Sequence, residues 1–342
     1  MIVVIVDSYK SALGFSALAR QRYEDSVILA ANEFATPSSL LKSIEALSPT
    51  VVLFSFRNAF LDALSIRASF SSLSKLHKSA LFGLLIPDYL EIENSGQNVS
   101  SITINSLDFL LTTNLDLESK YKEIYGGSCP IFTYHDLVDI NRINSHRRIE
   151  QIQSESIIWI GNSKWGTRQG KIDHKGFRDV IVPLVNSFVG ENIEIKIVDS
   201  AKKRLQHHEV LNELSKSSIL LHPSHSEGTG LPILEAALLG CYPITTNVGI
   251  AHELLGEQFP FLIVDRKLES FEKAVRLIQN LNNSERHKLV QVAEDFQQKI
   301  LSESIPRNLE SKRTTFPHDL SVFKRIHLLV RWNFRYFISR RR

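Results

Sequence analysis

The sequence is poor in the residues that cross-link proteins or bind metals through sulfur. Its 342 residues include only two cysteines, Cys129 and Cys241. Two cysteines cannot build a disulfide framework or a four-cysteine zinc site, so a reducing cytosol is the expected setting. The apolar start Ile2–Val6 lacks the basic flank of a secretory signal, and no apolar run reaches the roughly 18 residues of a membrane-spanning helix. We therefore expect a cytoplasmic protein that does not cross a membrane by a helix.

The composition is that of an ordinary globular protein, but the charge is unevenly placed. Hydrophobic residues make up 43% and charged residues 23%, which excludes disordered and low-complexity classes. At roughly 150 residues per domain, the length indicates about two domains. The net charge is +3, and residues 321–342 hold seven Lys or Arg and no acid, so the remainder carries −4. An anionic partner is therefore expected at the carboxyl-terminal tail.

Short runs of Ile, Val, Leu and Phe alternate with segments of helical periodicity, which is typical of strands in a covered parallel sheet. Strands are expected at 2–6, 51–56, 80–86, 109–112 and 131–134 and, after a polar interval at 141–150, at 157–160, 193–198, 218–222, 242–245 and 261–263. Helices are expected at 37–47, 117–125, 212–216 and 231–239. This pattern predicts an α/β fold of two doubly wound Rossmann-like domains facing across a cleft, where ligands should bind.

Several nucleotide-binding and metal-binding motifs are missing. No lysine follows Gly166, as a P-loop requires, and Ile233 stands where a dinucleotide fingerprint needs its third glycine. No zincin-type histidine motif is present, and we expect no metal site. The histidine pairs, His207 with His208 and His222 with His225, are interpreted as surface or loop residues.

The most informative segment runs from residue 218 to residue 249. It combines a buried strand, a polar glycine-containing turn, a helix starting near Leu231 with Pro232 in its first turn, and a stop at Gly240. The amino terminus of that helix directs unsatisfied N–H groups into the crevice, which suits a phosphate, and Gly228 and Gly230 let an anion approach the backbone.

Two carboxylates flank this helix start. Glu235 lies about one turn inside the helix, within reach of hydroxyls on a ligand whose phosphate meets the helix end. Glu227 precedes the helix. From spacing alone, the pair is as compatible with solvated helix acids, Glu227 merely complementing the helix dipole, as with a sugar or ribose site.

The run Glu227-x7-Glu235, with Gly228-x-Gly230-Leu231-Pro232 inside it and Gly240-x-x-Pro243 after it, resembles the donor-site signature of GT-B fold glycosyltransferases, closest to the retaining family 4 type. The close resemblance covers about residues 155–265. It implies that 1–145 form an acceptor-side domain and that 146–310 form a nucleotide-sugar-binding domain, while the charge pattern makes 311–342 a basic amphipathic helix or tail.

The resemblance also implies roles for individual residues. Glu235 would contact the nucleotide ribose and Glu227 the hydroxyls of the transferred sugar. Backbone groups of the turn and helix start would meet the diphosphate or the sugar; the residues are Gly228, Thr229, Gly230 and Leu231. No metal or other cofactor is implied, because cations and helix-end amides can neutralise a departing nucleoside diphosphate.

Family members also carry cations on the turn after the first strand of the second domain. Here that strand ends at Gly161, and Lys175-Gly176 matches the family's Lys-Gly, so Lys175 is a predicted catalytic residue. Asn162 replaces the usual arginine, and Lys164 or Arg168 would supply the second cation. In the first domain, Asp88 is the candidate for a contact with the acceptor or donor sugar, or else a turn cap.

The tail has the pattern of a basic amphipathic helix. Four cations cluster within about 40° on a helical projection, beside an arc of aromatic and aliphatic residues; they are Lys324, Arg331, Arg335 and Arg342. Such a helix can dock on an anionic membrane surface, or its apolar face can pack on the protein. Nucleic acid is not an expected partner, because the acidic body would repel it.

Together these features predict a retaining glycosyltransferase at the inner face of the cell membrane. It would move a sugar from a nucleoside diphosphate sugar, UDP or GDP, to a glycan or lipid-linked acceptor, such as one in bacterial surface polysaccharide or lipopolysaccharide synthesis. The alternatives are an epimerase or hydrolase of the same fold, or a catalytically inert module that binds a nucleotide sugar or glycan within an assembly complex.

Overall fold

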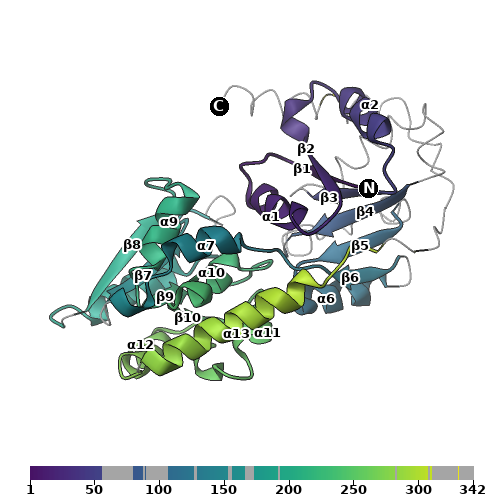
Figure 1. Cartoon of the computed structure of the whole chain (residues 1–342). Coiled ribbons are helices and arrows are strands. Elements are labelled where there is room, and N and C mark those ends of the chain that lie inside the picture. Colours follow the sequence, from purple (N-terminus) through teal and green to yellow (C-terminus); the bar gives the residue numbers. More distant parts are fainter. Residues whose placement is uncertain are drawn as a thin grey trace. The chain divides into compact units, whose positions relative to one another are not determined.

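The computed structural model describes residues 1–55, 80–87, 89, 107–126, 129–152, 156–165, 173–191, 193–281, 283–306, 309 and 330. Internal contacts divide the chain into two compact units. One comprises Met1–Leu137 with Leu301–Arg342, and the other comprises Val138–Ile300. The sequence prediction placed its boundaries after residues 145 and 310. Figure 1 shows the elements of both units.

The first unit is built on a six-stranded parallel sheet with the order β2-β1-β3-β4-β5-β6. Its strands are β1 (Ile2–Val6), β2 (Ser26–Ala30), β3 (Val51–Ser55), β4 (Leu81–Ile86), β5 (Phe109–Thr112) and β6 (Ile131–Thr133). Its helices are α1 (Ala12–Gln21), α2 (Pro37–Leu47) and α6 (Leu115–Tyr125), with a 3-10 turn at Ala31–Glu33. Because β1 pairs with both β2 and β3, the strand order changes direction there, as in doubly wound folds.

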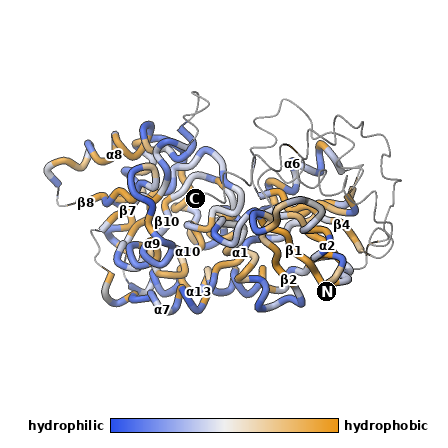
Figure 2. The backbone as a smooth tube through the Cα atoms, turned by 90° about the horizontal axis from the view of Figure 1, so that it is seen from above, coloured by the Kyte–Doolittle hydropathy of each residue, from blue (hydrophilic) through white to orange (hydrophobic). Residues whose placement is uncertain are grey.

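Both faces of this sheet are buried, which explains the continuous apolar strands. Val3 and Ile5 of β1 belong to one core cluster, which also includes Leu40 of α2 and Tyr121 of α6. Val4 belongs to the opposite cluster. In Figure 2 the hydrophobic colour runs along β1. The alternation of neighbouring residues between two cores is the period-2 geometry of a strand covered on both sides.

The second unit is built on a four-stranded parallel sheet with the order β10-β9-β7-β8. Its strands are β7 (Ser156–Gly161), β8 (Glu194–Asp199), β9 (Ile219–His222) and β10 (Tyr242–Thr245). Its helices are α7 (Ile140–His146), α8 (Val182–Ser187), α9 (His207–Leu214), α10 (Leu231–Leu239), α11 (Ala251–Leu255), α12 (Leu268–Ile278) and α13 (Asn283–Leu301). A π-helical turn spans Phe177–Ile181, and 3-10 turns span Ile149–Gln151 and Pro260–Leu262.

The helix α10 is the central helix of this unit. All of its residues from Ile233 to Leu239 are buried, including the carboxylate residue Glu235. It contacts α7, α9, β9 and β10. A helix that is apolar on every side must lie in a core, so its position is fixed by packing rather than by an amphipathic stripe.

The predicted α/β class with parallel sheets is confirmed, and the structure differs from the sequence expectations at three places. The strand β2 was missed. The strand expected at 261–263 is instead the turn Pro260–Leu262, followed by a single bridge from Ile263 to Thr245. The interval 141–150, expected as a polar connection, mostly forms α7 and the start of a 3-10 turn. No helix in the described part of the chain is long and apolar enough to span a membrane.

Candidate functional site

The second sheet has its topological switch point at β7, which lies between β9 and β8. In open parallel sheets, ligands bind outside the carboxyl ends of the strands at such a point. The segments that leave this edge follow Gly161, at the end of β7, and His222, at the end of β9. They are the two segments in which the sequence predicts the donor site.

The segment after β9 ends in the amino terminus of α10. Gly230 is the residue before the helix and has a positive φ of 76°. Gly228, Thr229 and Gly230 are all buried, and the carbonyl of Thr229 accepts a hydrogen bond of 3.0 Å from the backbone N–H of Ile250. The turn is thus fixed from outside the helix, and the amino terminus of α10, which begins at Leu231, lies at the carboxyl edge of the sheet.

Lys175 and Glu227 come together at this edge. The Lys175 ammonium donates a short hydrogen bond to Glu227 Oε1, and the two side chains are only 23% and 15% exposed. His222 Nε2 lies 3.2 Å from the same oxygen, within ion-pair distance but not in hydrogen-bonding geometry. Burial alone would raise the pKa of the Glu227 carboxyl, but Lys175 and His222 outweigh it, so the pKa lies well below its usual 4.5. Glu227 is therefore an anion at neutral pH.

The turn that carries Lys175 is fixed by its contacts with the β9 segment. The backbone N–H of His225 donates to the carbonyl of His174 at 2.7 Å, and the indole of Trp159 donates to the carbonyl of Lys175 at 3.3 Å. Gly176 has a positive φ of 66°, and any Cβ there would collide with the carbonyl of Pro223. This close backbone approach explains why glycine follows the lysine.

Arg266 clamps the same two segments together. Its guanidinium donates to the carbonyl of Pro223 at 3.0 Å and, in a short hydrogen bond, to the carbonyl of Asp173. It also pairs with the Asp179 carboxylate at 3.1 Å. The Asp173 carboxylate in turn accepts from the backbone N–H groups of Arg178 and Asp179, at 2.5 and 3.0 Å. The Lys175–Glu227 pair is therefore held by a preorganised backbone rather than by two flexible side chains alone.

Glu235 lies one turn inside α10 and pairs with His207, the first residue of α9. The distance from His207 Nε2 to Glu235 Oε1 is 2.7 Å, and the Glu235 side chain is only 8% exposed. On its other side, His207 Nδ1 lies 3.2 Å from Arg142 Nη1 of α7. The Glu235 hydrogen bond raises the pKa of the His207 imidazole above its usual 6.5, although burial and Arg142 act in the opposite direction.

The segment after β7 is held by hydrogen bonds to Asp199, at the end of β8. The Asp199 carboxylate accepts from the backbone N–H of Ser163 at 3.1 Å and from its hydroxyl at 2.6 Å. Burial alone would raise the pKa of Asp199, but the hydrogen bonds from Ser163 and Ala201 lower it below the usual value. The neighbouring Lys164 side chain is exposed, and its backbone N–H donates to Asn162 Oδ1 at 3.0 Å.

The structure thus brings one group of predicted residues together, while other predicted residues lie outside its described part. Lys175, Glu227 and the residues 228–231 share one edge of the second sheet, with Glu235 one turn into α10 and Gly161 at the end of β7. Outside the described residues lie Asp88, Arg168 and the four tail cations Lys324, Arg331, Arg335 and Arg342. The described residues contain no group of three or more His, Cys, Asp or Glu that could hold a metal ion.

Sequence reasoning missed two histidines at this edge. The surface or loop interpretation was wrong for His222, which is the buried last residue of β9, and incomplete for His207, which pairs with Glu235. It holds for the exposed His208 and His225. The available signal for His222 was its place directly after Ile219–Leu221, at the carboxyl end of an apolar run.

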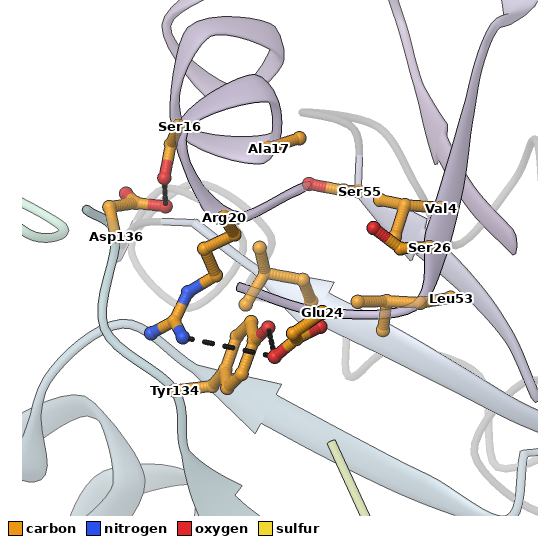
Figure 3. Close-up of a pocket in the computed structure, with 11 residues that line it drawn as sticks. Val4, Ser16, Ala17, Arg20, Glu24, Ser26, Leu53, Ser55, Tyr134 and Asp136 are labelled. Atoms are coloured by element: carbon orange, nitrogen blue, oxygen red, sulfur yellow. Dashed lines mark hydrogen bonds and ion pairs between the residues drawn. The ribbon is translucent and has the colours of Figure 1, made fainter. Parts of the chain in front are cut away.

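The first unit has a small pocket with a polar wall (Figure 3). Ser16 donates to the Asp136 carboxylate at 2.8 Å, the Tyr134 hydroxyl donates to Glu24 at 2.5 Å, and the Arg20 guanidinium stacks 3.6 Å above the Tyr134 ring. Burial raises the pKa of the Tyr134 hydroxyl far above its usual 10. These polar side chains bind one another, and none of the residues predicted for the donor or acceptor site lines the pocket.

Part of the second unit matches a known protein family. Residues 200–296 match the model described as glycosyl transferases group 1. The match includes Glu227, the turn 228–230 and α10 with Glu235, but it does not include Lys175. A search of curated proteins found no match to the sequence.

Solved structures with a similar fold include a trehalose-phosphate synthase and a starch synthase. A UDP-forming trehalose-phosphate synthase from Burkholderia xenovorans matches with a TM-score of 0.61 and 8% identity, over 88% of this chain and 96% of that one. The catalytic domain of starch synthase IV from Arabidopsis thaliana, bound to ADP and acarbose, matches with a TM-score of 0.56 and 9% identity, over 88% and 99%.

A mutant of TarM from S. aureus is a further similar structure. It is in complex with fondaparinux, α-GlcNAc-glycerol and UDP, and it matches with a TM-score of 0.51 and 11% identity, over 78% of this chain and 59% of that one. The chain also spans 58% of the matching chain in the GtfA/B complex. At such low identities, these likenesses establish the fold and not a substrate.

Two parallel doubly wound sheets, with the carboxylates and the cation gathered at the switch point of the second, define the class of protein. The chain has the GT-B fold of the glycosyltransferases. Within it, residues 200–296 are similar to the glycosyl transferases group 1 family, which supports a glycosyltransferase enzyme. Membership of family 4 in particular remains a prediction from the sequence resemblance.

Proposed function

We propose that the protein transfers a sugar from a nucleoside diphosphate sugar, UDP or GDP, to a glycan or lipid-linked acceptor with retention at the anomeric carbon. The observation that carries the proposal is the fixed Lys175–Glu227 pair beside the amino terminus of α10. A cation, a carboxylate and the positive end of a helix dipole at one sheet edge match the diphosphate and the hydroxyls of such a donor.

Each group has a proposed role in the reaction. Glu235 accepts hydrogen bonds from the ribose hydroxyls, the amino terminus of α10 faces the diphosphate, and Glu227 binds hydroxyls of the transferred sugar. Lys175 is shared between Glu227 and the diphosphate. Gly161 lets the ligand approach the end of β7, and Lys164 or Arg168 supplies a second cation. Asp88, which belongs to the first unit, is proposed to contact the donor or acceptor sugar.

The chemistry needs no group beyond these residues and the two substrates. The acceptor oxygen forms a bond to the anomeric carbon on the face from which the diphosphate leaves, and the bond between that carbon and the diphosphate oxygen breaks with its electron pair on the diphosphate. The acceptor proton passes to the departing phosphate. Lys175 and the α10 amides stabilise the charge that develops on it, so we propose that no metal is required.

Release of nucleoside diphosphate is the direct test of the transfer. Purified protein is incubated with UDP-sugars and GDP-sugars and with a bacterial lipid or glycan extract, and both nucleotide release and labelled product are measured. We expect release that depends on the extract and falls at least about 100-fold in Lys175→Met. Release without any extract would instead indicate an epimerase or a hydrolase, and binding without any product would indicate an inert binding module.

We also propose a peripheral location at the inner face of the cell membrane, with surface polysaccharide or lipopolysaccharide synthesis as the setting. This part is supported by the sequence of residues 321–342 alone. Each cation near an anionic surface contributes up to about 1 kcal/mol. Sedimentation with vesicles containing phosphatidylglycerol should retain the full chain and release a chain ending at residue 320. Equal retention of both chains would refute the docking role of the tail.

A further inference from the structure

The first step concerns the position of His207 relative to the proposed donor pocket. Both α9 and α10 follow the carboxyl end of a strand, β8 and β9 respectively, so their amino termini lie at the same edge of the sheet. His207 is the first residue of α9, and Glu235 is the fifth residue of α10. The 2.7 Å contact between them therefore joins two helix starts at the edge where a nucleotide is proposed to bind.

The second step concerns the charge of Glu235. A carboxylate that is only 8% exposed needs hydrogen-bond donors, because burying an unpaired charge is costly. Among the described side chains, His207 supplies the donor to Oε1, and none donates to Oε2. Oε2 is thus the oxygen to which a ligand hydroxyl can donate without displacing an existing bond.

The third step fixes the tautomer of the imidazole. Arginine has no hydrogen-bond acceptor, so at 3.2 Å Arg142 Nη1 must donate to His207 Nδ1, which then carries no hydrogen. The hydrogen of the neutral ring is left on Nε2, which faces Glu235. The groups that face the ring are Glu235 of α10, Arg142 of α7 and Asp139, which precedes α7. The Nε2 hydrogen is also present in the imidazolium, so the bond to Glu235 persists in both protonation states of His207.

We propose that His207 is a positioning residue for Glu235: it holds Oε1 so that Oε2 is presented to the ribose hydroxyls of the donor, and Arg142 fixes the tautomer that does so. The inference rests on the proposed function, because it takes Glu235 as the ribose contact. It adds a specificity role, since a rigidly held carboxylate favours nucleotides that carry both ribose hydroxyls over those that lack them.

The test compares a nucleotide with its dideoxy form. UDP, GDP and ADP are titrated calorimetrically into wild-type protein, and the tightest binder is compared with its 2′,3′-dideoxy counterpart. In His207→Phe we expect the ribonucleotide to bind about tenfold more weakly and the dideoxynucleotide to bind as in wild type. In His207→Gln, whose side-chain N–H can replace Nε2, most of the affinity should return. His208→Phe is the matched control, because His208 is the exposed neighbour on the same helix.

The outcomes separate the inference from the proposed function. If His207→Phe binds both nucleotides equally more weakly, or binds both as wild type does, the positioning role is overturned. This holds even if Glu235→Gln no longer discriminates between the ribonucleotide and the dideoxynucleotide, which would leave the donor pocket intact. If wild type binds no nucleotide, or Glu235→Gln binds both as wild type does, the donor pocket itself is wrong and the inference falls with it.

The imidazole tautomer gives a readout that does not depend on any ligand. Nitrogen-15 spectra of the wild-type protein, assigned by comparison with His207→Gln, should show neutral His207 with its hydrogen on Nε2. Arg142→Met should produce a mixture of tautomers, because the donor to Nδ1 is lost. A wild-type ring with its hydrogen on Nδ1 would contradict the proposed chain of donors.

Discussion

At the scale of single residues, the site depends on charges that are held in place rather than on their number. Glu227 is paired from two directions, and its partners Lys175 and His222 come from different segments of the chain. The backbone around Lys175 is fixed by Gly176 and Arg266. A cation that is already oriented loses little entropy when a diphosphate arrives, which is the physical basis for proposing a catalytic role for Lys175.

The depressed pKa of Glu227 predicts a pH-dependent contribution to stability. A carboxyl whose folded pKa lies below its unfolded value stabilises the fold above pH 4.5, and this stabilisation is lost as the pH falls through the folded pKa. Lys175→Met should therefore lower the free energy of unfolding by about 2 kcal/mol at pH 7 and by less under acid conditions. Urea unfolding at pH 7 and pH 3.5 measures the difference.

The control for this variant is Lys196→Met. Lys196 also pairs with a glutamate, Glu213, but the lysine side chain is 51% exposed. Exposed pairs contribute little, so we expect a change of at most about 0.5 kcal/mol at either pH. If Lys175→Met loses no more free energy of unfolding than the control, or loses the same amount at both pH values, the proposed stabilisation by the Glu227 anion is contradicted.

At the scale of elements, the helix α10 links the core of the second unit to its site. Its amino terminus forms the candidate phosphate site, and its carboxyl end is capped by two arginines. Arg147 Nε donates to the carbonyl of Leu238 at 2.9 Å, and Arg286 Nη1 donates to that of Gly240 at 2.7 Å. Cations at a helix carboxyl end satisfy its last carbonyls and complement its dipole, so these contacts fix the direction in which α10 points.

The end of α10 provides a stability prediction. Gly240 has a φ of 81°, and a Cβ there would lie 3.3 Å from side-chain carbons of both Arg286 and Ile149. Gly240→Ala should cost about 2–3 kcal/mol, from the left-handed backbone and the crowding together. Gly190→Ala is the matched control, because Gly190 has a φ of 90° with no atom within 4 Å of the Cβ position, and it should cost only about 1 kcal/mol.

Thermal or urea unfolding of the two variants separates the cost of the left-handed backbone from the cost of crowding. The excess in Gly240→Ala over Gly190→Ala measures the crowding against Arg286 and Ile149. An equal loss in both would show that the neighbours move aside without cost, and that the cap of α10 is looser than its contacts indicate.

At the scale of the whole molecule, both sheets follow from apolar runs, but the long-range pairings within the site do not follow from local sequence. The strand β2 was missed because it is an edge strand, partly exposed at three of its five residues and therefore weakly apolar. The apolar segment 261–263 does not form the expected strand, because Pro260 favours the first turn of a short helix.

The donor motif was recognised from sequence because its glycines and glutamates lie within nine residues. The pairing of Lys175 with Glu227 spans 52 residues, and that of His207 with Glu235 spans 28. Such contacts are set by strand order, which places separate segments at one edge of a sheet, and no local pattern encodes them. Asp88, Arg168 and the membrane role of the tail remain predictions.

The proposed charge stabilisation by Lys175 and the α10 amides predicts a metal-independent enzyme. Addition of excess EDTA to the transfer assay should change the initial rate by less than about twofold, and adding Mg²⁺ or Mn²⁺ afterwards should not raise it. A loss of activity with EDTA that Mg²⁺ restores would contradict the metal-free mechanism while leaving the donor pocket intact.

The central claim is that the carboxyl edge of the second sheet binds a nucleotide sugar through Glu235. Thermal stabilisation by UDP-, GDP-, ADP- and CMP-sugars at millimolar concentration, in wild type and in Glu235→Ala, tests it most directly. The account predicts a clear rise in melting temperature for one class of nucleotide, because ligand at 100 times its Kd adds about 2.7 kcal/mol, and predicts that the rise disappears in the variant. No rise with any of them, or an equal rise in both proteins, would contradict the account.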